Sequence, residues 1–110
     1  MYLPKKDLYE SLQTLGYAVT QTQQTVFNTL PTIVFRVTDN SIETNLDNEI
    51  AFQDIEVMID IWADTSVEAS RVLSEVEELL RSQLWKMTYS ADVPNTGNIY
   101  HTVSRFNKKV

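Results

Sequence analysis

The sequence predicts an α+β fold in which about four to five strands form one mainly antiparallel sheet, packed by one long and one short helix. A length of 110 residues suits one compact domain, so we expect residues 1–110 to form a single unit. Within a strand expected at 50–63, apolar residues from Ile55 to Ile61 occupy every second position, which is the period of a half-buried strand. From residue 66 onward they recur every three or four positions, as in an amphipathic helix. The predicted order of elements is α-β-β-β-α-β-β.

The strand predicted at 50–63 has two faces of different chemistry. One face should pack against the core, and the other should meet water or a partner. The packing residues are Ile55, Val57, Ile59 and Ile61, and the outward residues are Glu56, Met58, Asp60 and Trp62. Because Met58 and Trp62 interrupt an acidic face, we expect either the first helix or a neighbouring subunit to cover them.

The long helix should lie across this sheet. Thr65 and Glu68 have the spacing of a capping box, which marks the start of the helix. The acidic Glu68 also suits the positive end of the helix dipole. Trp85 follows the last turn and is expected at the edge of the core. The apolar stripe comprises Val72, Leu73, Val76, Leu79, Leu80 and Leu84.

A short helix is predicted from Pro4 to Leu15, because proline suits a first turn and Gly16 can adopt the left-handed conformation that ends a helix. A short strand should follow at 17–19. The polar segment 20–25 has neither Gly nor Pro, and both a loop and an exposed strand stay open there. The narrow apolar stripe of the helix is Leu8, Leu12 and Leu15.

Three more strands complete the prediction. Residues 32–38 follow Pro31 and should pair antiparallel with 50–63, because the connection is too short for a parallel crossover. That connection, Asp39 to Asn48, is polar and is expected to be a long loop of functional importance. Further strands at 86–91 and 99–106 should form a hairpin around the turn at 94–97.

Charge is divided along the chain. Residues 1–38 carry three basic and two acidic side chains, residues 39–78 one basic and twelve acidic, and residues 79–110 five basic and one acidic. Sequence-specific nucleic-acid binding is not expected, because only Arg105, Lys108 and Lys109 resemble a basic cluster. The acidic part of one copy could dock on the basic part of the next, which favours head-to-tail rings. Alternatively, the acidic residues only solvate the surface.

The composition also limits the class of protein. No apolar run could span a bilayer, and the first residues lack the apolar core of a signal peptide, so we expect cytoplasmic synthesis and no membrane partner. The chain has no Cys, which removes disulfides, thiol nucleophiles and thiolate metal sites together.

No group of residues suggests catalysis, a metal or a cofactor. His101 is the single histidine, and Ser104 should lie on the opposite face of the same strand, so we interpret His101 as structural. Asp54, Glu56 and Asp60 share a strand face, but even alternate residues of a strand sit about 6–7 Å apart and would need other ligands to complete a cation site, so a solvated or interface face is a better interpretation. We expect no enzymatic activity.

The order of features resembles the tail-terminator, or tail-completion, family of long-tailed bacteriophages and their prophages. The resemblance covers roughly residues 4–106. It is carried by the strand after Pro31, by the run from Ala51 to Ala63 and by the helix opening at Thr65-Ser66-Val67-Glu68-Ala69. It implies a structural protein that assembles as a ring, commonly a hexamer, at the head-proximal end of the tail tube and joins the tube to the head connector or stopper protein.

If the resemblance holds, the partners are other copies of the chain, the tail-tube protein and the connector. Localisation would be the host cytoplasm during assembly and then the virion. The candidate ring and partner interface comprises Asp39, Glu43, Asp47, Glu49, Glu56, Met58, Asp60, Trp62, Arg105, Lys108 and Lys109. Two alternatives stay open: a connector or stopper protein of the phage neck, and a small host ligand-binding or regulatory α+β domain.

Overall fold

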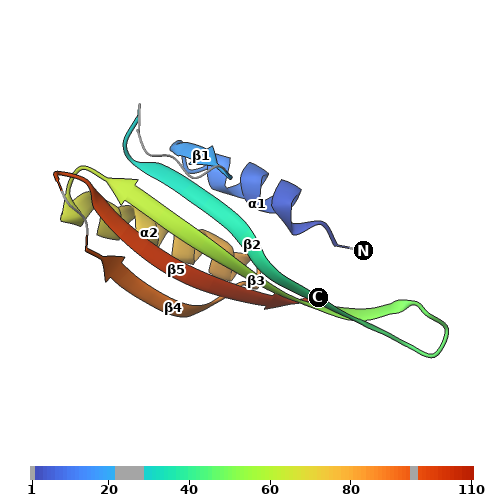
Figure 1. Cartoon of the computed structure of the whole chain (residues 1–110). Helices are drawn as coiled ribbons and strands as arrows, with labels where there is room; N and C mark the ends of the chain where they lie inside the picture. The colour runs from blue at the N-terminus through green and yellow to red at the C-terminus, as the bar shows by residue number, and fades with distance from the viewer. Residues whose placement is uncertain (1, 22–28, 95–96) are drawn as a thin grey trace.

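A computed structural model describes residues 2–21, 29–94 and 97–110, and it confirms the predicted α+β class and element order. The helices are α1 (Pro4–Gln13) and α2 (Ser66–Ser82). The strands are β1 (Ala18–Thr20), β2 (Thr32–Thr44), β3 (Ile50–Ala63), β4 (Lys86–Val93) and β5 (Tyr100–Lys109). They form one sheet in the order β1-β2-β3-β5-β4, shown in Figure 1.

The sheet is mixed rather than wholly antiparallel. Short β1 pairs parallel to β2, from Ala18 beside Thr32 to Thr20 beside Val34. All other neighbours are antiparallel, including the predicted β2–β3 and β4–β5 hairpins. The open question about the polar segment is answered only in part: Thr20 belongs to β1, while residues 22–28 lie outside the described residues.

Both helices pack on the same face of the sheet, so the core is a single layer between helices and strands. The predicted packing parity of β3 is confirmed, since its four residues on that face are fully buried. One cluster joins these residues to Leu8 and Leu12 of α1 and to Val72, Val76 and Leu80 of α2. Figure 1 shows α2 running behind the sheet. The opposite face, called the open face below, carries neither helix.

The start of α2 follows half of the predicted capping box. The Thr65 hydroxyl accepts a hydrogen bond from the Glu68 backbone N–H at 3.1 Å. The Glu68 carboxylate lies 3.3 Å from the Arg71 guanidinium, and the neighbouring Asp64 carboxyl raises the pKa of Glu68. The ion pair with Arg71 therefore occupies the carboxylate that was expected to reach back to the cap.

The predicted stripe of α2 is wrong at Leu84. The helix ends at Ser82, and Leu84 adopts a left-handed conformation with φ of 71° and is 80% exposed. The Trp85 backbone N–H donates to the Leu80 carbonyl at 2.9 Å, closing the end of the helix in the manner of a Schellman motif. This reversal of the chain directs Trp85 into the core, where it is buried more deeply than the predicted core edge.

The loop predicted at 39–48 is wrong, because most of it is strand. β2 continues to Thr44 and stays paired with β3, with Asp39 opposite Glu56 and Thr44 opposite Ile50. A tight turn closes the hairpin: the Asn45 side-chain oxygen accepts from the Asp47 and Glu49 backbone N–H groups at 2.9 and 3.0 Å. The polar composition hid the strand, since a ribbon exposed on both faces has no apolar alternation to reveal it.

This hairpin extends well beyond the rest of the sheet. We call residues 39–52 the arm; Figure 1 shows it passing the C-terminus and extending away from both helices. Six paired residues of β2 at about 3.3 Å each give the arm a length of roughly 20 Å. The molecule is accordingly elongated, with extents of 54 × 24 × 22 Å.

Candidate interaction surfaces

The arm combines carboxylates with exposed apolar side chains. It contains four predicted interface residues, Asp39, Glu43, Asp47 and Glu49, and no Lys, Arg or His. Its apolar residues are also uncovered: Leu46 at the turn is fully exposed, and Ile42, Ile50 and Phe52 are each about two-fifths exposed. Exposed apolar side chains on a projecting ribbon are typical of a surface that binds another protein.

A buried glutamine fixes the root of the arm. Gln53 is 2% exposed, although it lies where β3 leaves the core. Its amide oxygen accepts from the Tyr2 backbone N–H at 2.8 Å, and its amide nitrogen donates to the Tyr2 carbonyl and to the Asn40 side-chain oxygen, both at 3.2 Å. Its backbone also forms two hydrogen bonds with Val110, at 2.8 and 2.9 Å. Gln53 therefore ties the arm to both ends of the described chain.

The open face can be described as transverse rows, because residues paired in an antiparallel sheet point to the same side. The row at the far end from the arm is Thr32, Trp62, His101 and Val93, and the next is Val34, Asp60, Val103 and Ala91. The middle row is Arg36, Met58, Arg105 and Tyr89. The rows nearest the arm mix charges, with Asp39, Glu56, Asn107 and Lys86 and then Ser41, Asp54 and Lys109.

Trp62 and Met58 are not covered by the first helix, because α1 packs on the other face. Instead, the Trp62 ring stacks on the His101 imidazole with centroids 3.7 Å apart and planes within 9°. The His101 Nε2 lies 3.2 Å from the Asp60 Oδ1, without the alignment of a hydrogen bond. All three side chains hold one another at the end of the open face, which agrees with a structural role for His101.

The arginine row is the most prominent cationic feature of the open face. The Arg36 Nη2 lies 3.2 Å from the Met58 sulfur, and the Arg105 guanidinium carbon lies 5.3 Å from the centre of the Tyr89 ring. Among the described residues, neither guanidinium has a carboxylate within 4 Å. Two exposed arginines beside apolar groups therefore have no ion-pair partner within residues 2–21, 29–94 and 97–110.

The three basic residues predicted to act together do not share a face. Arg105 and Lys109 lie on the open face. Lys108 points to the helix side, where its Nζ is 4.9 Å from the centre of the Tyr2 ring and 5.5 Å from that of Trp85. Alternation along β5 separates them, so Lys108 contributes to packing at the amino terminus rather than to the open face.

Tyr2 is perturbed in this setting. Burial raises the pKa of Tyr2 to about 12, and the nearby charge of Asp7 and a hydrogen bond to its carboxylate act in the same direction. The neutral phenol is therefore the form favoured by the fold. The contacts of Tyr2 with Asp7 and Lys108 therefore hold the first residues against the sheet, in addition to the hydrogen bonds from Gln53.

Two other hydrogen bonds bring carboxylates of α2 together with neighbours. The Tyr17 hydroxyl donates to Glu75 at 2.6 Å, which raises the pKa of Tyr17 and ties the end of α1 to α2. A hydrogen bond to Asp64 raises the pKa of Glu68 at the start of α2. Both contacts lie away from the arm and the open face, and the Tyr17–Glu75 hydrogen bond supports the packing of the helix layer.

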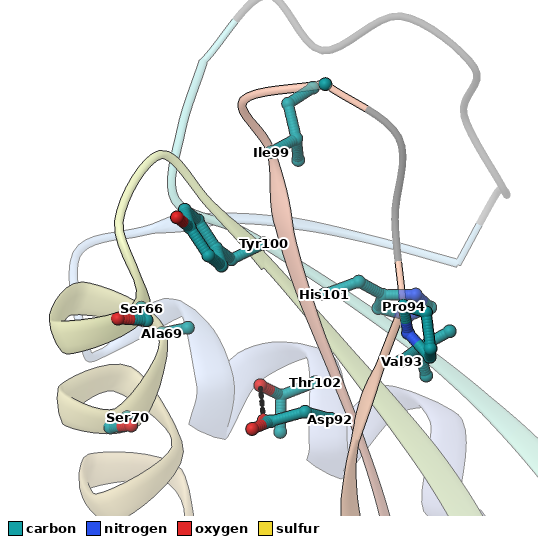
Figure 2. A pocket seen from close by; sticks show the side chains of 11 residues that line it. Ser66, Ala69, Ser70, Asp92, Val93, Pro94, Ile99, Tyr100, His101 and Thr102 are labelled. Atoms are coloured by element: carbon teal, nitrogen blue, oxygen red, sulfur yellow. Dashed lines mark hydrogen bonds between the residues drawn. The ribbon is translucent and has the colours of Figure 1, made fainter.

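A groove of about 480 Å³ lies at the opposite end of the molecule from the arm. Figure 2 shows the first turns of α2 on one side and the ends of β4 and β5 on the other. Thr102 donates to Asp92 at 3.1 Å across its floor, so two of its polar groups already satisfy each other. The wall contains Ser66, Ala69, Val93, Pro94 and Tyr100.

The described part of the chain contains no cluster of three or more His, Asp or Glu side chains that could hold a metal ion. Within the same described ranges, no helix is long and apolar enough to cross a membrane. Comparison with protein-family models finds no match for the chain, and comparison with curated proteins finds none either.

Sequence reasoning missed three elements of these surfaces. Arg36 was read only as part of a strand, although its parity with Val34 places it on the open face. Gln53 was not singled out, and a lone Gln gives no sequence signal of burial. The apolar residues of the arm carried a signal, since Ile42, Leu46 and Ile50 recur at intervals of four in a segment otherwise polar.

Proposed function

We propose that this chain is a structural tail-completion protein of a long-tailed bacteriophage or prophage, without enzymatic activity. It would cap the head-proximal end of the tail tube as a ring and join it to the head connector. Assembly would take place in the host cytoplasm, and the protein would end in the virion. The observation that carries the proposal is the pairing of a sheet face that carries neither helix, and that exposes Arg36 and Arg105, with a projecting arm, because a protein that must bind copies of itself and two other proteins needs several separate surfaces.

The sequence resemblance supports the same function. The strand carrying Asp60 and Trp62 and the helix opening at Thr65 lie at the centre of the fold. The charge distribution also suits assembly, since the arm is wholly acidic and the exposed arginine row lacks ion-pair partners among the described residues. A ring with an acidic lumen would let DNA pass without binding it tightly.

The test is capping of tail tubes. A candidate tail-tube protein is allowed to polymerise with and without the purified protein, and tube lengths are measured by negative-stain electron microscopy. We expect added protein to stop growth and to appear as a ring at one tube end. A variant lacking arm residues 40–51 tests whether the arm is needed: it should fold but cap the tubes poorly.

Unaltered tube lengths, together with no binding to tube ends, would overturn the terminator function. Binding to the connector alone would then favour the stopper role in the phage neck. The host-domain alternative predicts a monomer that ignores both proteins and binds a small molecule, and the groove beside Tyr100 is where a ligand would be sought.

A further inference from the structure

The acidic arm cannot bind the arginine row of its own chain. The arm continues the direction of β2 and β3 and leaves the sheet past the C-terminus, as Figure 1 shows. Arg36 lies on β2 just before the arm begins, and Arg105 lies two strands away in the same row. Any contact between the two surfaces therefore needs a second molecule.

The chemistry of the two surfaces is complementary. On the arm, the Glu43 carboxylate lies opposite the exposed Phe52 ring in the β-ladder, and Glu49 and Asp47 follow at the turn. On the open face, each arginine lies beside an apolar partner, Met58 or Tyr89. The arm therefore offers a carboxylate beside an aromatic ring, and the open face offers a guanidinium beside an aromatic ring or a thioether.

We propose that the arm of one copy docks on the arginine row of the open face of a second copy, with Glu43 and Glu49 pairing with Arg36 and Arg105. This contact rests on the ring assembly proposed above and names the surfaces that make it. Because the arm and the row are different parts of one molecule, the contact is heterologous and repeats from copy to copy until the ring closes. In the neighbouring row, the Glu56 carboxylate disfavours a shifted alignment of the acidic arm by repulsion.

Other carboxylates on the open face do not compete for the row. Asp54 accepts a hydrogen bond from the Asn107 side chain at 2.6 Å, and Glu56 accepts one from the Thr38 hydroxyl at 3.0 Å. Asp60 lies beside His101. Asp54 and Glu56 are thus hydrogen-bonded within their own chain and Asp60 is only 7% exposed, whereas the two arginines have no carboxylate within 4 Å among the described residues.

Charge reversal with rescue tests the contact. The variant R36E/R105E has an acidic row, and the variant E43K/E49K has a basic arm. Sedimentation across a concentration series should show the wild-type chain as a ring and each variant alone as a monomer, with the dissociation constant raised at least about 100-fold, because close charge pairs across an interface couple strongly. An equimolar mixture of the two variants should recover the wild-type mass, since each arm then meets a row of opposite charge.

A chain with all four substitutions should also assemble by itself. Matched controls carry the same charge changes at exposed positions of the helices: K5E/K6E for the row and E10K/E78K for the arm. These controls should assemble like the wild type. Circular dichroism and thermal melting establish that every variant is folded before its mass is compared.

The proposal is overturned if the wild-type chain is monomeric at every concentration, if either reversal leaves its mass unchanged, or if the mixture stays monomeric while both variants are folded. A wild-type ring that survives both reversals would leave ring assembly standing and remove this interface. Tube capping by a chain that never self-associates would leave the terminator function standing without it. A wild-type dimer that both reversals disrupt would keep arm-on-row docking and overturn the ring.

Discussion

Replacing Gln53 with leucine should loosen the arm and destabilise the whole chain. The side chain forms three hydrogen bonds, to the Tyr2 backbone N–H, the Tyr2 carbonyl and the Asn40 side chain, and it is 2% exposed. Leucine has a similar size but can form none of them. At about 1 kcal/mol for each bond, with an added cost for the partners left unpaired, we expect the free energy of unfolding to fall by about 2–4 kcal/mol.

Urea unfolding followed by circular dichroism measures this loss. With about 4 °C for each kcal/mol in a domain of this size, the melting temperature should drop by about 8–16 °C. Hydrogen exchange adds a local readout: amides of residues 39–44 should exchange faster, because Asn40 loses its tie to the core. Gln13→Leu, at an exposed position on α1, is the matched control and should change stability by less than about 0.5 kcal/mol.

A loss below about 0.5 kcal/mol in Gln53→Leu, with unchanged exchange in the arm, would refute this reasoning. It would mean that the backbone pairing between Gln53 and Val110 holds the root of the arm without the side chain. A large loss of stability with unchanged exchange in 39–44 would instead confine the role of Gln53 to anchoring Tyr2.

Three further predictions concern single side chains. Leu84→Gly should raise the free energy of unfolding by about 0.5–1 kcal/mol in urea titrations, because Leu84 is exposed at a φ of 71° that glycine adopts without strain, whereas Leu84→Ala should give no such gain. Because the pKa of Tyr2 is raised to about 12, the folded state favours the neutral phenol, and its contribution to the free energy of unfolding should be full below pH 10 and be lost between pH 10 and 12. In Tyr2→Phe the free energy of unfolding should decline less steeply over this range, and equal slopes in the two proteins would contradict the assignment. His101→Ala should lower the free energy of unfolding by about 1–2 kcal/mol, because it removes the stack on Trp62. In a Trp85→Phe background the same change should increase acrylamide quenching of Trp62 fluorescence. Unchanged quenching would show that the stack does not protect the ring.

The spacing of apolar residues predicted the core of this fold, because an element that buries one face needs apolar side chains at its own structural period. The alternation of β3 and the stripe of α2 identified seven of the thirteen residues in the buried cluster, and the stripe of α1 added Leu8 and Leu12. Leu84 broke the pattern, because its spacing fits the helix while the backbone reverses one residue before the buried Trp85. Side-chain spacing does not record where a helix stops when the terminating residue is not glycine.

The interaction surfaces were harder to predict, for reasons that differ between them. The acidic residues of 39–49 were found from composition, but a ribbon exposed on both faces leaves no signature that separates strand from loop. The arginine row depends on which strands are neighbours. Arg36 and Arg105 are 69 positions apart in sequence, and they share a row only because β3 lies between β2 and β5. The pairing of His101 with Trp62 needed the same register.

Residues 2 and 110 both contact Gln53, so any polypeptide attached at either end leaves the molecule beside the root of the arm. An affinity tag or a fluorescent fusion there would sit next to the segment whose freedom the assembly experiments depend on. Tags should therefore be removed by protease before masses are compared. Dyes for single-molecule work belong on the exposed side of α2, for example through Ser74→Cys, since the chain has no native cysteine to compete for labelling.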